Sequence, residues 1–167
     1  MFKYGIENLT TQKAVALAKG DERGILTEQA LLTVKESNAA VLAIAKGEAV
    51  VYGINTGFGP LCNTKISTED TSQLQRNILL SHSVGTGEPV DTFIAKLMLI
   101  LKVHSLSKGY SGISPVVLER ILWHIDMDII PLVPEQGSVG ASGDLAPLSH
   151  LFLPLIGEGY VLSLIHI

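Results

Sequence analysis

The residues with most chemical potential lie in one glycine-rich segment, residues 137–147, which reads GSVGASGDLAP. A loop of small residues that includes two serines, Ser138 and Ser142, suggests nucleophilic catalysis or phosphate binding. A hydrolase nucleophile elbow needs G-x-S-x-G, but Asp144 stands where the second glycine belongs. A P-loop ends in Gly-Lys-Ser/Thr, and residues 137–143 lack that ending. What remains is a compact loop that leads into a predicted helix start at Asp144, with Pro147 in its first turn.

Three further glycine-rich loops could also build a site: YGINTGFG at 52–59, SHSVGTG at 81–87 and KGYSG at 108–112. The plain alternative for each loop is a set of tight turns that need positive φ. YGINTGFG does not match the dinucleotide-binding spacing G-x-G-x-x-G. The histidines do not show the spacing of a metal site, so we expect none; they are His82, His104, His124, His150 and His166.

The elements that must position these loops are helical. Hydrophobic periodicity predicts a helix over 27–46 capped by Thr27, and a Ser67–Asp70 capping box begins another through 83. A third helix over 93–107 is apolar nearly all round, which is typical of a helix inside a bundle. Ser114-Pro115 begins a fourth. Only 49–52 and 128–133 are expected to be extended, so the predicted class is all-α.

Composition narrows the classes of protein that remain. The chain has 167 residues, enough for one domain, with 47 % apolar residues, 17 % charged residues and a net charge of −4. Apolar runs are too short to span a membrane, and no basic cluster suits nucleic acid. Cys62 is the only cysteine, which excludes an internal disulfide framework. We therefore expect a cytoplasmic protein that binds neither membrane nor nucleic acid, and a piece of a larger assembly.

The four loops together resemble the aromatic amino acid ammonia-lyase family. GSVGASGDLAPLSH is similar to the family signature, and YGINTGFG, LSHSVGTG and KGYSG resemble three further blocks in the family's order. The resemblance runs from about residue 26 to about residue 160. It implies the N-terminal helical domain of the fumarase/aspartase-like ammonia-lyase fold, with glycine-rich active-site loops and at most short β pieces.

The resemblance also implies a self-made electrophile, 4-methylidene-imidazol-5-one (MIO), and no external cofactor. In the family the glycine nitrogen attacks the alanine carbonyl, and loss of two waters leaves an exocyclic methylene. Carried onto this chain, Gly143 supplies the nitrogen, Ala141 the carbonyl and Ser142 the methylene, while Asp144 assists the cyclisation. We further expect the positive end of a helix that begins at Asp144 to face the ring and favour negative charge on it.

The implied reaction removes ammonia from an α-amino acid. Tyr52 matches the family's proposed catalytic base, and its alternative is a half-buried loop aromatic. His82, in the pair Ser81-His82, resembles the histidine-specific branch, which converts L-histidine to trans-urocanate in the first step of histidine degradation. Its alternative is a buried histidine bonded to a backbone carbonyl. Asn55 is expected to contact substrate or else to hold a turn.

Other outcomes stay open: a tyrosine or phenylalanine ammonia-lyase or aminomutase, or an inactive helical fragment that only assembles with full-length chains. Family chains are much longer and form homotetramers, so residues 1–167 are expected to be the N-terminal MIO-forming domain, ending before the central helical bundle. Residues 162–167 look like an atypical tail. We also expect apolar faces such as 93–101 to be exposed.

Overall fold

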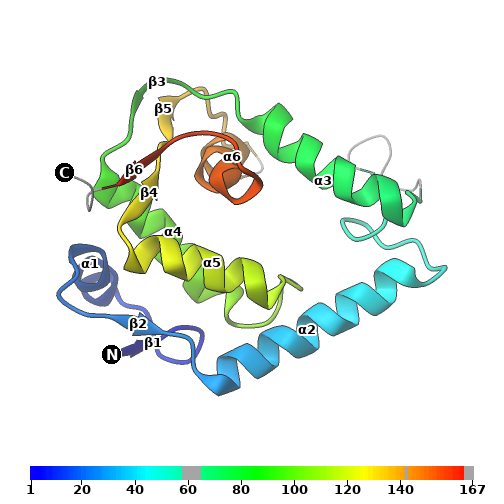
Figure 1. Cartoon of the computed structure of the whole chain (residues 1–167), viewed down its shortest axis with the longest axis horizontal. Helices are drawn as coiled ribbons and strands as arrows, with labels where there is room; N and C mark the ends of the chain where they lie inside the picture. The colour runs from blue at the N-terminus through cyan, green and yellow to red at the C-terminus, as the bar shows by residue number, and fades with distance from the viewer. Residues whose placement is uncertain (58–64, 142, 164–167) are drawn as a thin grey trace.

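The chain folds into helices joined by loops and a few very short strands, as a computed structural model shows for residues 1–57, 65–141 and 143–163 (Figure 1). The all-α prediction is confirmed. The helices are α1 Thr11–Lys19, α2 Glu28–Lys46, α3 Thr68–His82, α4 Thr92–Leu106, α5 Pro115–Asp126 and α6 Leu145–Phe152, followed by a 3-10 helix, Leu153–Ile156. The strands are β1 Phe2–Lys3, β2 Gly24–Ile25, β3 Thr86–Pro89, β4 Ile129–Pro131, β5 Pro134–Gln136 and β6 Val161–Ser163.

Helix starts follow the local capping chemistry that the sequence predicts. The Thr27 hydroxyl accepts a hydrogen bond from the Ala30 N–H (3.2 Å), and the Ser67 hydroxyl accepts one from the Asp70 N–H (3.1 Å). α5 begins directly after Ser114 with proline at its first position. The Thr27 and Ser67 caps each satisfy a backbone donor that a helix leaves unpaired, whereas the Ser114 side chain makes no capping hydrogen bond. These predicted starts are therefore confirmed.

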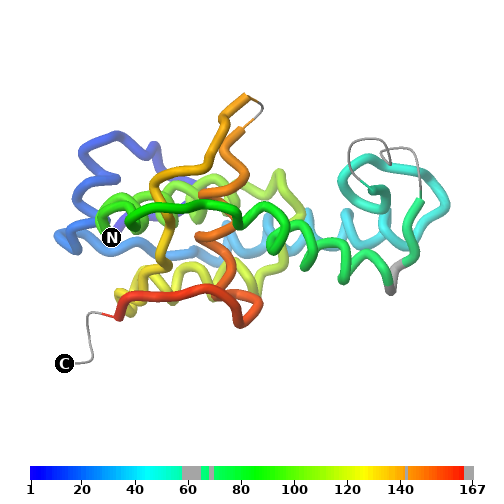
Figure 2. Tube along the Cα trace, turned by 90° about the horizontal axis from the view of Figure 1, so that it is seen from above, coloured from blue at the N-terminus to red at the C-terminus, as the bar shows by residue number. Residues whose placement is uncertain are grey.

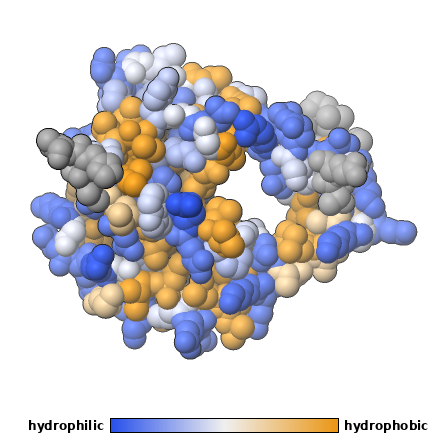
Figure 3. All heavy atoms as spheres, in the orientation of Figure 1, coloured by the Kyte–Doolittle hydropathy of each residue, from blue (hydrophilic) through white to orange (hydrophobic). Residues whose placement is uncertain are grey.

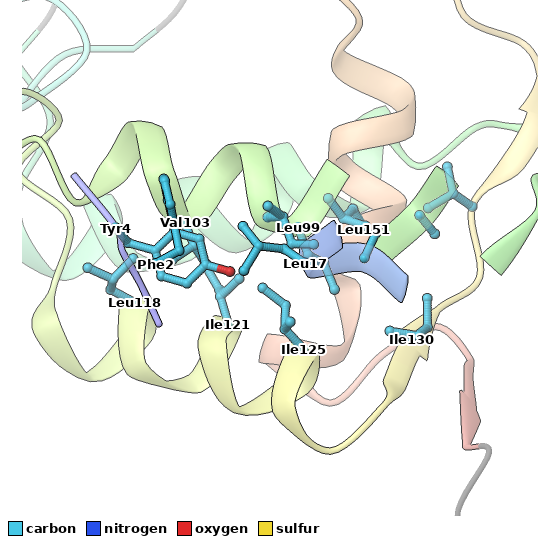
Figure 4. Close-up of a cluster of buried hydrophobic side chains, with 14 of the residues drawn as sticks. Phe2, Tyr4, Leu17, Leu99, Val103, Leu118, Ile121, Ile125, Ile130 and Leu151 are labelled. Atoms are coloured by element: carbon cyan, nitrogen blue, oxygen red, sulfur yellow. The ribbon is translucent and has the colours of Figure 1, made fainter. Parts of the chain in front are cut away.

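The core surrounds α4, which packs against α1 on one side and α5 on another. Figure 4 shows Leu99 and Val103 of α4 meeting Leu17, Leu118 and Ile121 from its two neighbours. Within α4 the side chains of 95, 99, 100 and 103 are buried. The expectation that 93–101 would present an exposed apolar face holds in part: Ile94 and Leu101 are exposed, whereas Ala95, Leu99 and Ile100 are buried.

The three two-stranded ribbons join distant parts of the chain. β1 pairs with β2 in parallel, while β3 pairs with β5 and β4 pairs with β6 antiparallel. β4 confirms the extended segment predicted at 128–133, whereas 49–52 forms turns and no strand. Leu162 and Ser163 of the expected tail pair with β4, and residues 164–167 lie outside the described residues. No described helix is long and apolar enough to cross a membrane.

α2 and α3 form an arm that extends away from the helical body (Figures 1 and 2). Residues 47–57, which follow α2, lie at the far end of this arm (Figure 1). In the space-filling view of Figure 3, an opening separates the arm from the body. Val34 near the start of α2 is buried, but Leu42 near its end is half exposed. The body thus holds only one end of the arm.

The KGYSG loop fixes α2 to the body. The Asn38 side-chain amide donates to the Gly112 carbonyl (2.8 Å), and the Gly112 N–H donates to the Ser37 hydroxyl (3.1 Å). A Cβ on Gly109 would lie 2.4 Å from the Thr33 methyl, and one on Gly112 would lie 2.3 Å from a Val41 methyl. Both glycines have positive φ. This block of the sequence is therefore a docking turn for α2.

Candidate active site

The loop that precedes α6 is held by its own polar groups. Asp144 is the N-cap residue of α6, which confirms the predicted helix start, but its carboxylate does not cap the helix. Instead Asp144 Oδ1 accepts a hydrogen bond from the Ser138 hydroxyl at 2.8 Å. The bond spans six residues and closes the loop on itself. Ser138 thus fixes where the carboxylate lies.

Backbone compression within this loop requires small residues. The Ala141 N–H donates to the Val139 carbonyl at 2.8 Å, which marks a tight turn. A Cβ on Gly140 would lie 2.7 Å from Asp144 Oδ1, so a larger residue there would displace the carboxylate. Gly143 has φ +117°, a conformation that side chains disfavour. Ser142 lies outside the described residues.

His82 is the last residue of α3, and its ring is held by its own helix. Nδ1 lies 2.8 Å from the Ile78 carbonyl and 3.1 Å from the Ser81 hydroxyl. Because a carbonyl can only accept, Nδ1 carries the proton in this arrangement. The other ring nitrogen, Nε2, is then a hydrogen-bond acceptor. The carbonyl bond that the alternative interpretation expected is present, and it leaves one nitrogen for another partner.

One pocket of about 200 Å³ brings the end of α3 and the loop before α6 together. His82 and Gly143 both line it, although they are 61 positions apart in the sequence (143 − 82). The pocket walls are Ser81, His82 and Val84 on the α3 side, and Ser138, Val139, Gly143, Leu145 and Ala146 on the α6 side. Among these residues the polar side chains are those of two serines and a histidine. A small polar substrate could be held there.

Tyr52 and Asn55 lie in the segment at the far end of the arm. This segment adjoins the start of α3, since Thr56 forms an isolated bridge with Lys65. His82 is at the opposite end of α3, and a helix of 15 residues is about 22 Å long. Within this chain, therefore, the structure does not bring Tyr52 or Asn55 to the pocket. The Tyr52 side chain is 64 % exposed.

Asn55 is buried and bonds only to neighbouring backbone in the described residues. The side-chain oxygen Oδ1 of Asn55 accepts from the Val51 N–H (2.8 Å). Its side-chain nitrogen Nδ2 donates to the carbonyl of Ala49 (2.8 Å) and to that of Ile44 (3.4 Å). These bonds hold the turn and explain why 49–52 is not extended. They correspond to the turn-holding role; a substrate contact stays a prediction.

Two residues that the sequence analysis did not single out belong to this region. Ser138 bonds the Asp144 carboxylate, and His150 on α6 accepts a hydrogen bond from the Gly85 N–H at 3.0 Å. Both stand inside the block GSVGASGDLAPLSH. Their presence in that block is the only signal that pointed to them. In the described residues, no group of three or more metal-ligating side chains is placed to hold an ion.

The helical fold and the loop before α6 agree with one family of lyases, and a family model identifies it. The model for the aromatic amino acid lyase family matches residues 9–164, so the chain belongs to this family. Its members make their MIO group from their own backbone. The compressed loop fits that group, because a larger residue at position 140 would displace the Asp144 carboxylate and the space beside Gly143 is open.

The individual proteins that this chain resembles include two histidine ammonia-lyases and a tyrosine aminomutase. The chain is 48 % identical over 151 residues to a histidine ammonia-lyase of Paracidovorax citrulli, covering 90 % of this chain and 30 % of that protein. Histidine ammonia-lyase from Trypanosoma cruzi superposes with a TM-score of 0.87 at 35 % identity, over 98 % of this chain and 31 % of that one. Tyrosine aminomutase from Streptomyces globisporus superposes with a TM-score of 0.89 at 31 % identity. The match covers 99 % of this chain and 31 % of that one. The chain thus spans about a third of its relatives' length.

Proposed function

We propose that this chain is the N-terminal, MIO-forming part of a histidine ammonia-lyase, which eliminates ammonia from L-histidine to give trans-urocanate. The observation that carries the proposal is the pocket that places His82 beside Gly143. The relatives named histidine ammonia-lyase support the choice of substrate. On this proposal Ala141, Ser142 and Gly143 form the group without an external cofactor.

The chain's own residues perform two tasks in this proposal. His82 Nε2, an acceptor because Nδ1 is bonded to the Ile78 carbonyl, receives an N–H of the substrate imidazole. Asp144, held by Ser138, keeps the loop compressed while the ring forms. The MIO group, once formed, supplies the electrophile that makes loss of ammonia possible. Tyr52 is proposed as the base that removes the β-proton.

Tyr52 must reach a pocket that its own chain does not place near it. The arm carries Tyr52 away from the body, so its action requires a partner chain or a rearranged arm. We propose that the assembled enzyme is a homotetramer and that it resides in the cytoplasm. A substrate other than L-histidine is the principal alternative, since tyrosine aminomutase shares this fold at 31 % identity. His82 Nε2 can accept from an imidazole N–H or from a phenol O–H, so the relatives named histidine ammonia-lyase carry the choice of L-histidine.

Intact mass and turnover together test the proposal. The purified chain should weigh two water molecules less than its sequence predicts, and Ser142→Ala should abolish that loss. A fusion of the chain to the remaining length of the Paracidovorax citrulli relative should convert L-histidine to a product with the absorbance of urocanate. An unmodified mass of both the purified chain and the fusion would refute MIO formation. Turnover of L-tyrosine in preference to L-histidine would refute the substrate.

A further inference from the structure

A hydrogen bond from α6 joins the two walls of the pocket, in addition to the pairing of β3 with β5. His150, six residues after Asp144 on α6, accepts through Nε2 from the Gly85 N–H at 3.0 Å. Gly85 comes three residues after His82. The bond therefore connects the helix that follows Gly143 with the loop that follows His82. The two partners are 65 residues apart in sequence.

The contact leaves little room at position 85, because any side chain there would require its neighbours to shift. A Cβ on Gly85 would lie 3.0 Å from His150 Nε2 and 3.1 Å from the Pro134 Cβ. On the other side, a Cβ on Gly137 would lie 3.2 Å from the Gly85 Cα. Three segments, namely the loop after α3, β5 and α6, thus meet at van der Waals distance around one imidazole. A shift of that ring would move the loop.

The protonation state of His150 is fixed by its partner. A backbone N–H can only donate, so Nε2 must be unprotonated and Nδ1 carries the proton. Burial lowers the pKa of His150, which keeps the ring neutral at neutral pH. His150 is therefore an acceptor under the conditions in which an amino acid lyase works. Its hydrogen-bonding role is the reverse of that of His82, whose Nδ1 donates to a carbonyl.

We propose that His150 is a positioning residue that sets the separation between His82 and position 143 by holding the Gly85 loop against α6. The inference rests on the proposed function, because the two walls it joins are those of the proposed active site. His150 does not line that pocket, so it acts through the loop and not on the substrate. Losing the bond loosens the Gly85 loop, which directly follows the helix end that carries His82, without removing any group from the pocket.

A second link between α3 and the region after α6 provides a matched control. Arg76, in the middle of α3, donates to the Ile156 carbonyl (3.3 Å) and pairs with Glu158 (2.5 Å). This link is partly exposed, and Arg76 lies six residues before His82 on the same helix. Removing it loosens the contact between α3 and the segment after α6 without touching the Gly85–His150 bond. Arg76→Gln therefore separates general loosening from loss of the specific bond.

The test measures amide exchange at Gly85 and the ring signals of His82 by NMR in the isotope-labelled chain. His150→Leu fills the space but cannot accept a hydrogen bond. His150→Gln places an oxygen near the position of Nε2, whereas His150→Asn is too short to do so. Loss of a net hydrogen bond of about 1 kcal/mol corresponds to about fivefold faster exchange. We expect that acceleration, with shifted His82 signals, in the Leu and Asn variants only.

In the fusion the Leu variant should raise KM for L-histidine more than it lowers kcat, and the Gln variant should restore KM. The inference is overturned if Gly85 exchange and His82 signals stay as in the parent for both Leu and Asn. It is equally overturned if Arg76→Gln changes them as much. Should the Leu variant not fold, the Asn variant alone decides. Absent turnover in the parent would count against the proposed function and leave the NMR test valid.

Discussion

At the scale of single residues, the candidate site depends on which nitrogen of each histidine carries a proton. His82 donates from Nδ1 to a carbonyl, while His150 accepts at Nε2 from a backbone amide. Neither state follows from the sequence, because both partners are backbone groups of folded segments. The family motif does identify His82 and the Ala141–Gly143 triplet as candidates. The motif does not distinguish Ser138 and His150 from the other residues of the loop and the helix that contain them.

His82 should discriminate between substrates by hydrogen bonding. His82→Leu removes the acceptor from the pocket and leaves the imidazole N–H of the bound substrate unpaired. An unpaired buried N–H weakens binding by about 1–3 kcal/mol. We therefore expect kcat/KM of the fusion for L-histidine to fall about tenfold or more, while kcat/KM for L-phenylalanine falls little. His82→Gln, which offers an oxygen near the position of Nε2, is the matched control. Equal losses for both substrates in the Leu variant would contradict a hydrogen-bonding role.

Ser138 should affect formation of the prosthetic group more than stability. Ser138→Ala removes the hydroxyl that bonds Asp144 Oδ1, so the carboxylate beside Gly140 loses its hydrogen-bond partner among the described residues of the loop. We expect a smaller fraction of the chain to show the loss of two waters in its intact mass after expression. Ser138→Thr keeps the hydroxyl and should restore that fraction. Complete dehydration in the Ala variant would show that Asp144 needs no such anchor.

At the scale of elements, the sequence predicts what is decided locally. Thr27, Ser67 and Asp91 cap the helices that follow them, because a side chain and a backbone N–H two or three residues away suffice. The pairing of β3 with β5 could not be predicted, since it depends on contacts between distant segments. The short extended segment expected at 49–52 is absent because Asn55 takes up the backbone groups there.

The docking of KGYSG on α2 gives a prediction at this scale. Gly112→Ala adds a Cβ that would lie 2.3 Å from the Val41 methyl at a φ of +68°. Gly20→Ala is the control, because Gly20 has φ +81° but no atom within 4 Å of the added Cβ. We expect Gly20→Ala to lower the free energy of unfolding by about 1 kcal/mol and Gly112→Ala by about 2–4 kcal/mol. Urea titrations measure both. Similar losses would show that α2 moves aside readily.

At the scale of the whole molecule, a packed body carries a protruding arm. The periodicity of α2 and α3 predicts two amphipathic helices but not that each is only half covered, because coverage depends on what lies beside them. Leu42 on α2 and Leu80 on α3 are both substantially exposed. The separation of Tyr52 from the pocket arises at this scale as well. No local pattern in YGINTGFG indicates that its loop lies about one helix length from His82.

The stability of the body should fall as the solution becomes acidic. His104 is buried in the core and its Nδ1 accepts from the Gly5 N–H (3.3 Å). Desolvation, and secondarily the charge of Lys108, lowers the pKa of His104. An unfolded histidine, with pKa about 6.5, binds protons that the folded one excludes. Stability from His104 is therefore full above about pH 6.5 and is lost as pH falls below it.

The urea midpoint should drop between about pH 7.5 and about pH 5.5. His104→Asn keeps an acceptor near the position of Nδ1 but does not titrate, so its midpoint should drop less; an equal drop would place the pH dependence elsewhere.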